Sequence, residues 1–373
     1  MKFGKMLFIL IFLLTNLFAH VNNVNLTPQA QDQNKRFFTP NVVLIERKII
    51  DVESDEDFLK YNLTGLGTIE KPFIIENFNI TNSEEFSIGN ISDDNRAGIY
   101  IRNTTKNFII QNCFLKGYYS GISIVLVKEN TGIIRNNIIQ AYSTGINIVE
   151  SDELKCEKNY CSAKNFGISV TGSKKVQINS NYCFNSSKGI EMFFSDYTII
   201  ESNNASSNQI GIKITGSDSC NLYSNTCENN KNGIVIGNSG VLKIPEDPPP
   251  PDLKQCLLKF NLLLNNTEYG VVLEETARKC RIYDNFFVKN KKDHQAFDAG
   301  KRNKWYNYWE KEGNYWSDLG DKKTYTIDGP AGSIDRYPLN ENLERTSLFS
   351  YACILSLTLV GLIITRIQRR KKK

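Results

Sequence analysis

The sequence predicts an all-β protein whose chain winds into a parallel β-helix of about 22 residues per coil, with a cap at each end and one transmembrane helix near the C-terminus. The first observation behind this prediction is a repeated phrase of glycine, an apolar residue, any residue and an apolar residue. The phrase begins at Gly98, Gly121, Gly145, Gly167, Gly189, Gly211 and Gly233, at intervals of 22 to 24 residues, and returns at Gly270 after an insertion. A fixed period of this length is typical of a solenoid.

The second observation is the pattern inside each repeat, where apolar residues such as Ile99 and Ile101 alternate with polar ones. Alternation rich in β-branched residues indicates strands rather than helices. Leucine-rich repeats share the period, but their leucine scaffold is missing here. Each period has room for three short strands and three turns, so one repeat corresponds to one coil, and successive coils stack about 4.8 Å apart.

The third observation is an asparagine that keeps the same phase in the repeat. Asn112, Asn159, Asn181, Asn203 and Asn225 each follow their glycine by 14 residues. Stacked coils would align these side chains into an internal ladder of amide hydrogen bonds at a turn. We interpret the ladder as structural, and we interpret the glycines as turn residues that precede a strand.

The regions before the coils and the insertion within them have their own signatures. Residues 1–20 place two lysines before an apolar run, which is typical of a secretory signal peptide, although an uncleaved anchor is the alternative. Residues 21–42 are polar and predict a disordered linker, and residues 43–96 predict an N-terminal cap. The coils extend over residues 97–300. Their proline-rich insertion at 240–255 projects from one turn, either as the wall of a groove or as a plain surface loop.

The C-terminal part begins with an aromatic cap at residues 301–340, which contains Trp305, Trp309 and Trp316. These rings can stack on sugars or plug the open end of the coils, and we favour the plug. Residues 347–365 form an uncharged, largely apolar run that is long enough to span a bilayer, and a basic tail follows at 366–373. The basic end argues against a removable lipid-anchor signal. We therefore expect a single-pass protein of the cell membrane with an extracellular or periplasmic ectodomain and a cytoplasmic C-terminus.

The charge balance supports this division. The formal net charge is +5, but the tail holds six positive charges and the signal peptide two, which leaves −3 for the region between them. The basic balance therefore reflects targeting, and nothing indicates a nucleic-acid partner.

The cysteines and the glycosylation sequons are relevant to the cellular compartment in which the protein is found. Apart from Cys353, eight cysteines lie in the predicted ectodomain, and several keep phase with the repeat, so they are either buried core thiols or disulfides between coils. Those eight are Cys113, Cys156, Cys161, Cys183, Cys220, Cys227, Cys256 and Cys280. No CxxC pair points to a metal cluster. Eight Asn-x-Ser/Thr sequons are candidates for glycans: Asn25, Asn62, Asn79, Asn90, Asn103, Asn185, Asn204 and Asn265.

The repeat coils, the segment from Gly67 to Ile80 and the block from Gly313 through Asp318 to Leu339 together resemble a known family. They are similar to the right-handed parallel β-helix proteins of the NosD-like class, over roughly residues 60–340. The family name implies an accessory role in copper-site maturation. The wider superfamily of carbohydrate-binding and sugar-hydrolase β-helices implies polysaccharide binding or cleavage.

The residue inventory argues against copper, because copper sites use His, Met and Cys. The chain has two histidines, His20 at the predicted cleavage point and His294, and its methionine outside the signal peptide, Met192, points inward. We expect no metal and no cofactor.

An enzyme of this fold needs paired carboxylates on one outer face. The outward positions of the glycine-led strands offer Glu191, Lys213 and Phe193 as one acid, base and aromatic cluster, with Tyr100 on the same row. Glu191 is the candidate catalytic residue. Loop acids at Asp93, Asp94, Asp152 and Glu153 are possible additions to a site.

These observations predict a membrane-anchored extracellular β-helix that binds a polysaccharide or glycan without catalysis, through Tyr100, Glu191, Phe193 and Lys213. A polysaccharide hydrolase or lyase is the main alternative. A structural spacer of the cell envelope and a copper-accessory protein are further alternatives.

Overall fold

The computed structural model describes residues 43–82, 96–237, 256–291 and 294–339. The predicted signal peptide, linker, basic tail and membrane span at 347–365 lie outside these ranges, as does the insertion at 240–255. Across the described residues, no helix combines the length and the apolar character that a bilayer-spanning segment needs.

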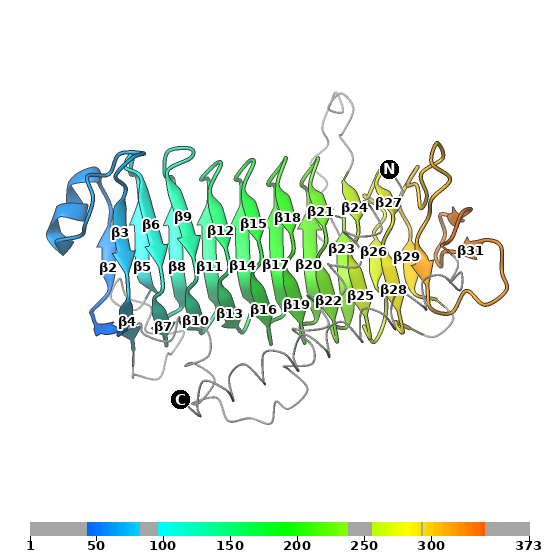
Figure 1. Ribbon diagram of the computed structural model, residues 1–373, viewed down its shortest axis with the longest axis horizontal. Coiled ribbons are helices and arrows are strands. Elements are labelled where there is room, and N and C mark those ends of the chain that lie inside the picture. Colours follow the sequence, from blue (N-terminus) through cyan, green and yellow to red (C-terminus); the bar gives the residue numbers. More distant parts are fainter. Residues whose placement is uncertain (1–42, 83–95, 238–255, 292–293, 340–373) are drawn as a thin grey trace, which may run out of the picture. The chain divides into compact units, whose positions relative to one another are not determined.

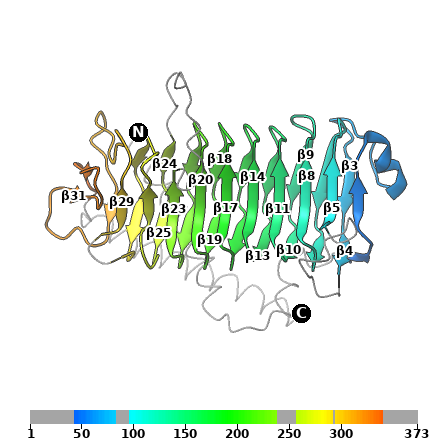
Figure 2. The same ribbon diagram turned by 180° about the vertical axis from the view of Figure 1, so that it is seen from behind.

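The described chain forms a right-handed parallel β-helix with three sheets, which we call A, B and C (Figures 1 and 2). Sheet A contains β1 (Ile45–Glu46), β4 (Phe78–Thr81), β7 (Phe114–Lys116), β10 (Ile138–Ala141), β13 (Tyr160–Ala163), β16 (Tyr182–Phe184), β19 (Asn204–Ser206), β22 (Thr226–Glu228), β25 (Leu262–Leu264), β28 (Phe286–Val288) and β30 (Tyr315–Trp316). Sheet B contains β2 (Ile50–Val52), β5 (Ala97–Arg102), β8 (Ser120–Val125), β11 (Thr144–Val149), β14 (Phe166–Thr171), β17 (Lys188–Phe193), β20 (Ile210–Thr215), β23 (Asn232–Ile236), β26 (Val271–Leu273) and β29 (Ala296–Asp298). Sheet C contains β3 (Phe73–Glu76), β6 (Phe108–Gln111), β9 (Gly132–Arg135), β12 (Lys155–Glu157), β15 (Gln177–Asn179), β18 (Ile199–Glu201), β21 (Asn221–Tyr223), β24 (Leu257–Lys259) and β27 (Arg281–Tyr283).

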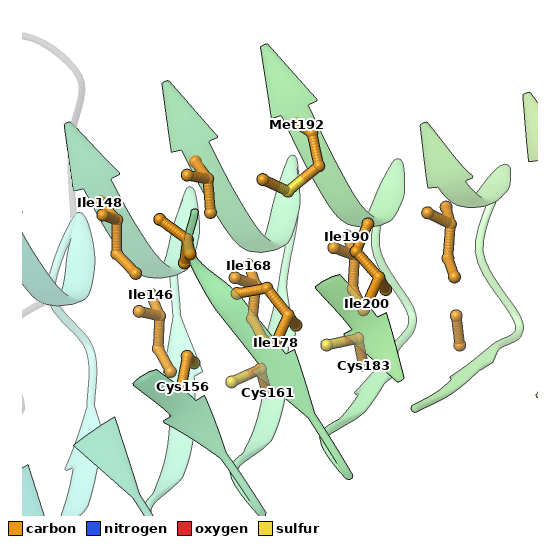
Figure 3. Packing of buried hydrophobic residues seen from close by; sticks show 14 of the residues in the cluster. Ile146, Ile148, Cys156, Cys161, Ile168, Ile178, Cys183, Ile190, Met192 and Ile200 are labelled. Atoms are coloured by element: carbon orange, nitrogen blue, oxygen red, sulfur yellow. The ribbon is translucent and has the colours of Figure 1, made fainter. Parts of the chain in front are cut away.

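The register of the strands follows from the sequence period. In sheet B, Ile146 pairs with Ile168 and Ile168 with Ile190, so equivalent residues of successive coils stand directly beside one another. Their side chains point inward and form apolar columns (Figure 3). Because strands alternate their faces, each inward residue leaves an outward neighbour on the same coil. The predicted parallel β-helix is confirmed.

Seven of the eight repeated glycines lie inside the strands of sheet B, so the interpretation as turn residues that precede a strand was wrong for them. Gly270 alone directly precedes its strand, β26. Gly211, for example, is the second residue of β20. A Cβ atom built on it would lie 2.6 Å from the backbone oxygen of Gly233 on the next coil. The glycine is therefore required because successive coils approach too closely there for any side chain.

The predicted asparagine ladder is present and longer than expected. The side chain of Asn159 donates to Asn181 at 3.0 Å, and Asn181 donates to Asn203 at the same distance. Asn112 is an exception: its neighbour Cys113 takes the equivalent position and donates its backbone N–H to Asn137. The complete ladder consists of Asn137, Asn159, Asn181, Asn203, Asn225, Asn261, Asn285 and Asn314.

The other two corners carry polar ladders over several of the coils, and neither ladder was predicted from the sequence. One consists of Asn208, Asn230, Asn266 and Asn290. In the other, the backbone N–H of each serine donates to the hydroxyl of the next serine, from Ser151 through Ser173 and Ser195 to Ser217. These side chains satisfy the backbone groups that the buried corners would otherwise leave unpaired.

The eight described cysteines are buried free thiols, which settles the alternative between thiols and disulfides for these residues. Burial raises the pKa of the Cys113 thiol to about 12. Cys161 and Cys183 are register partners on the inner face of sheet A, where they fill the core as small apolar residues do (Figure 3).

The first coil is built from residues 45–81 and carries a short 3-10 helix, η1 (Asp55–Tyr61). Phe58 of this helix is fully buried and stacks on Phe73, with ring centroids 4.7 Å apart. Both oxygens of the Asp55 carboxylate accept hydrogen bonds from Thr104 and Thr105 at 2.7 Å. The helix thereby covers one corner of the first coils.

Candidate functional site

The residues predicted to form a site on the outer face of sheet B are only partly brought together. Glu191 on β17 and Lys213 on β20 are register partners, and Phe193 lies two residues along β17. Tyr100 lies on β5, four strands away from β17, which corresponds to about 19 Å at the usual strand spacing. The structure therefore groups Glu191, Phe193 and Lys213, and separates Tyr100 from them.

The two charged residues of this group each pair with a different partner. Glu191 forms an ion pair with Lys188, three residues earlier on the same strand. Lys213 Nζ lies 2.8 Å from Glu274 Oε2, which reaches back over a neighbouring coil. Gly237 permits this crossing, because a Cβ atom there would lie 2.4 Å from the Cβ of Glu274.

Each pair is partly buried: Glu191 and Lys213 are 7% and 6% exposed, whereas the side chains of their partners Lys188 and Glu274 are 27% and 20% exposed. A buried ion pair neutralises its own charges and contributes little net stability. The geometry therefore gives Glu191 a partner in Lys188, and the second carboxylate that reaches this group, Glu274, is paired with Lys213.

The predicted loop carboxylates that the structure describes also serve as links between coils. Asp152 Oδ1 accepts a hydrogen bond from the backbone N–H of Lys174 at 2.7 Å. Glu153 forms an ion pair with Lys175 at 2.8 Å. Asp93 and Asp94 lie outside the described residues.

The C-terminal cap separates its three tryptophans into two environments. Trp305 and Trp316 are buried, and Trp316 stacks on Phe287 of the last complete coil at 4.1 Å. These two rings close the open end of the core, as the plug interpretation predicted. Trp309 is instead 89% exposed, and Tyr308 beside it is 64% exposed.

The exposed aromatic pair occupies a short hairpin. The backbone N–H of Asn307 donates to the carbonyl of Glu312 at 2.7 Å, which closes the turn. The rings of Tyr308 and Trp309 meet edge to face, with centroids 5.6 Å apart. Large exposed aromatic side chains are enriched at binding surfaces, because their apolar rings carry a polar atom at the edge. The plug interpretation therefore does not hold for Trp309.

A pocket of about 220 Å³ lies in the same cap, and we call it the cap pocket. It is lined by Gly300, Arg302, Asn303, Lys304, Trp305, Tyr306, Ala331, Gly332, Ser333, Ile334 and Arg336. These residues were not predicted from the sequence, although the basic run Lys301-Arg302-Asn303-Lys304 directly before Trp305 was a visible signal.

A buried carboxylate forms hydrogen bonds with several residues that line the cap pocket. Asp298, at the end of β29, is 1% exposed and accepts hydrogen bonds from four groups that line the pocket. The donors are the Gly300 N–H at 2.8 Å, the Asn303 amide at 2.9 Å, the Trp305 indole at 2.9 Å and the Ser333 hydroxyl at 2.7 Å. Charge-assisted hydrogen bonds of this kind fix the lining at a set geometry. The pocket is therefore held rigidly by the fold.

A second aromatic group lies on the outer face of sheet A but is less open. Tyr160 and Tyr182 stack with centroids 4.9 Å apart, and Phe184 packs against both rings. Both tyrosines are half-buried, and burial raises the pKa of Tyr182. The exposed hairpin of the cap is therefore the more accessible aromatic surface.

The candidate glycosylation sites differ in accessibility. Asn62, Asn103, Asn185 and Asn265 are exposed at turns, where a glycan has room. Asn79 and Asn204 are half-buried in strands, and their amides donate to Glu46 and Glu228. Asn90 lies outside the described residues.

The described residues do not fit a copper site. Among them, no group of three or more His, Cys, Asp and Glu side chains is placed so as to hold a metal ion. Met192 is fully buried in the apolar core, and burial raises the pKa of Cys156 well above its usual value. A thiol must lose its proton to bind a metal, so Cys156 is a poor ligand.

Fold and sequence together define a capped parallel β-helix protein. A family profile described as "Periplasmic copper-binding protein (NosD)" matches residues 120–320, which is more than half of the chain. The chain therefore belongs to the NosD family, in agreement with the resemblance noted from its motifs. No curated protein matches it in sequence.

Several solved structures are similar in fold. The A-module of mannuronan C-5 epimerase AlgE6 from Azotobacter vinelandii is 12% identical, with a TM-score of 0.41 over 69% of this chain and 80% of that one. An alginate lyase from Paenibacillus sp. str. FPU-7 is 11% identical, with a TM-score of 0.41 over 68% and 97%. The Dettilon tailspike protein is 15% identical, with a TM-score of 0.41 over 62% and 56%.

Proposed function

We propose that this NosD-family β-helix binds a polysaccharide or glycan at the cell surface and does not cleave it. The observation that carries the proposal is the exposed Tyr308–Trp309 pair on the cap hairpin. The fold does not need these rings, because Trp305 and Trp316 already close the core. Aromatic faces of this kind are suited to stack on the apolar faces of sugar rings.

The non-catalytic part of the proposal rests on the carboxylates. Glycoside hydrolysis uses two carboxylates that flank the bond. Glu191 and Glu153 are each engaged in an ion pair with a lysine, and Asp152 accepts a backbone hydrogen bond from the next coil. The proposal includes an anchor at residues 347–365, supported by their uncharged, largely apolar sequence.

The test measures binding and cleavage together. The full chain, in detergent, is incubated with neutral and acidic polysaccharides, and both retention on each polymer and new reducing ends are recorded. We expect retention without new ends, and a loss of retention in Trp309→Ala. New ends that disappear in Glu191→Gln would identify a hydrolase or lyase and contradict the proposal, and the absence of both signals would leave a structural spacer.

A further inference from the structure

The cap pocket carries an unbalanced positive charge. Its lining contains Arg302, Lys304 and Arg336, and no aspartate or glutamate. All three side chains are exposed, and in the described part of the chain none of them takes part in an ion pair. What sets the pocket apart is that three such cations line one cavity that has no acidic residue in its lining.

The buried carboxylate beneath the pocket does not cancel this charge. Against the three positive charges of the lining, buried Asp335, next to Arg336 in the chain, contributes at most one negative charge, and Asp298 contributes one. Both of its oxygens already accept hydrogen bonds from neutral donors of the lining, including Trp305 and Ser333. The pocket therefore keeps an excess positive charge, and guanidinium groups suit the planar geometry of carboxylate and sulfate groups.

The size and the surroundings of the pocket limit the class of ligand that it can bind. Its volume of about 220 Å³ is below the roughly 300–1,000 Å³ of pockets for drug-sized ligands, so it suits one ring or one acid group. Tyr306 forms part of its wall. Tyr308 follows two residues later, so its Cα lies within about 7 Å of the Cα of Tyr306. The exposed aromatic pair is therefore next to the cationic pocket.

We propose that the cap pocket binds the acid group of an anionic sugar residue, a uronate carboxylate or a sulfate ester, while Tyr308 and Trp309 stack on adjoining rings of the same polysaccharide. This inference rests on the proposed glycan-binding function and specifies its ligand class. Arg302, Lys304 and Arg336 select the charge, and the aromatic pair supplies affinity that is independent of charge.

The test compares matched polymers on the full-length protein in detergent. Polygalacturonate and its methyl-esterified form share a backbone and differ in free carboxylates, and dextran sulfate and dextran differ in sulfate. Poly-glutamate is an acidic polymer without sugar rings. We expect the protein to prefer at least one acidic polysaccharide over its neutral partner by about tenfold or more, and the polymer pair that shows this preference identifies the acid group.

Two triple variants test whether the cations of the cap pocket cause the preference for acidic polysaccharides. The triple change Arg302→Gln, Lys304→Gln and Arg336→Gln removes the preference, whereas a matched loss of three exposed charges, Lys128→Gln, Lys322→Gln and Lys323→Gln, changes affinity by no more than about twofold. Unchanged thermal unfolding of both variants establishes that they are folded.

The other outcomes separate the two proposals. Equal binding of acidic and neutral polysaccharides would overturn the acid-group inference and leave glycan binding in place. Binding of poly-glutamate as tight as that of the acidic polysaccharides would show that the pocket recognises charge without sugar, and would overturn it too. Absence of binding to every polysaccharide would contradict both.

Discussion

The central coils and the C-terminal cap differ in whether their polar, charged and aromatic side chains have partners within the protein. In the coils, asparagines, serines and ion pairs such as Lys213–Glu274 satisfy one another within the stack. In the cap, Trp309 and Tyr308 are exposed, and Arg302, Lys304 and Arg336 line a pocket without an acidic partner. The polar side chains of the coils therefore bond mainly to one another, whereas the cap presents exposed aromatic and cationic side chains that can contact a ligand.

The comparison explains why periodicity is a poor guide to the site. A residue that recurs with the repeat, such as Asn225, is selected by its neighbours on adjacent coils. A residue that appears once, such as Trp309, has no equivalent on an adjacent coil. In a solenoid, departures from the repeat are therefore the better place to look for function.

The largest expected effect on stability comes from removing the plug. Trp305→Ala should destabilise the protein by about 3–5 kcal/mol, because it opens a cavity beside Trp316 and leaves Asp298 without the indole N–H. Trp309→Ala is the matched control, and its unfolding temperature should be unchanged. Thermal unfolding followed by circular dichroism measures both. Similar losses in the two variants would contradict the division of the cap into plug and binding surface.

The next largest loss of stability is expected from breaking the asparagine ladder that runs from Asn137 to Asn314. Asn225 is fully buried, donates to the Ile200 carbonyl at 2.8 Å and accepts from the Asn203 amide at 3.0 Å. Asn225→Ala leaves buried groups on both adjacent coils unpaired and should cost about 3 kcal/mol. Asn221→Ala, on the outer face of β21, should cost less than about 0.5 kcal/mol. Denaturant titration compares them, and equal midpoints would refute the ladder as a stabilising element.

A smaller effect is expected at the N-terminal end as pH falls. Although partial burial opposes it, hydrogen bonds from Thr104 and Thr105 lower the pKa of Asp55 below its ordinary value of 3.8. Ionised Asp55 therefore stabilises the fold at all pH values above the unfolded pKa, and this stabilisation is lost as the pH falls through the folded pKa.

Asp55→Asn removes this titration. At pH 7 the variant should be about 1 kcal/mol less stable than the wild type, and the difference should shrink below pH 4. Unfolding temperatures measured from pH 7 to about 2.5 test it. A difference that stays constant over that range would exclude a role for the ionised carboxylate.

The smallest effect is expected when the cysteines of the folded protein are exposed to a thiol-labelling reagent. The eight described cysteines are buried free thiols, so a hydrophilic maleimide should leave them unmodified in the folded protein and modify them in denaturant. Mass spectrometry of peptides counts the labelled sites. Disulfide-linked peptides, or rapid labelling of Cys156 in the folded state, would contradict the packed core.

The sequence predicted the coils well and the site poorly, for physical reasons. The period fixed which residues share a column, so the ladder from Asn159 to Asn225 and the inward isoleucines could be assigned. Glu191 and Lys213 were correctly placed side by side, but their ion-pair partners depend on side-chain reach. Glu274 arrives from two strands away across Gly237, and no spacing rule predicts that.

The cap could not be assembled from sequence because it does not repeat. The cap pocket joins residues 300–306 to residues 331–336 through Asp298, a contact that depends on how the irregular chain folds back. The burial of Trp305 and the exposure of Trp309 differ for the same reason, although only four positions separate them. Composition alone gave all three tryptophans one interpretation.

The most direct test of the account measures where the glycan binds. Affinity for the best polysaccharide of the panel is compared in the wild type, in Trp309→Ala on the cap and in Glu191→Gln on sheet B, all as full-length protein. The account predicts that Trp309→Ala loses about tenfold or more in affinity while Glu191→Gln binds as the wild type does. The reverse pattern, with binding lost in Glu191→Gln and kept in Trp309→Ala, would place the ligand on the coils and contradict the account.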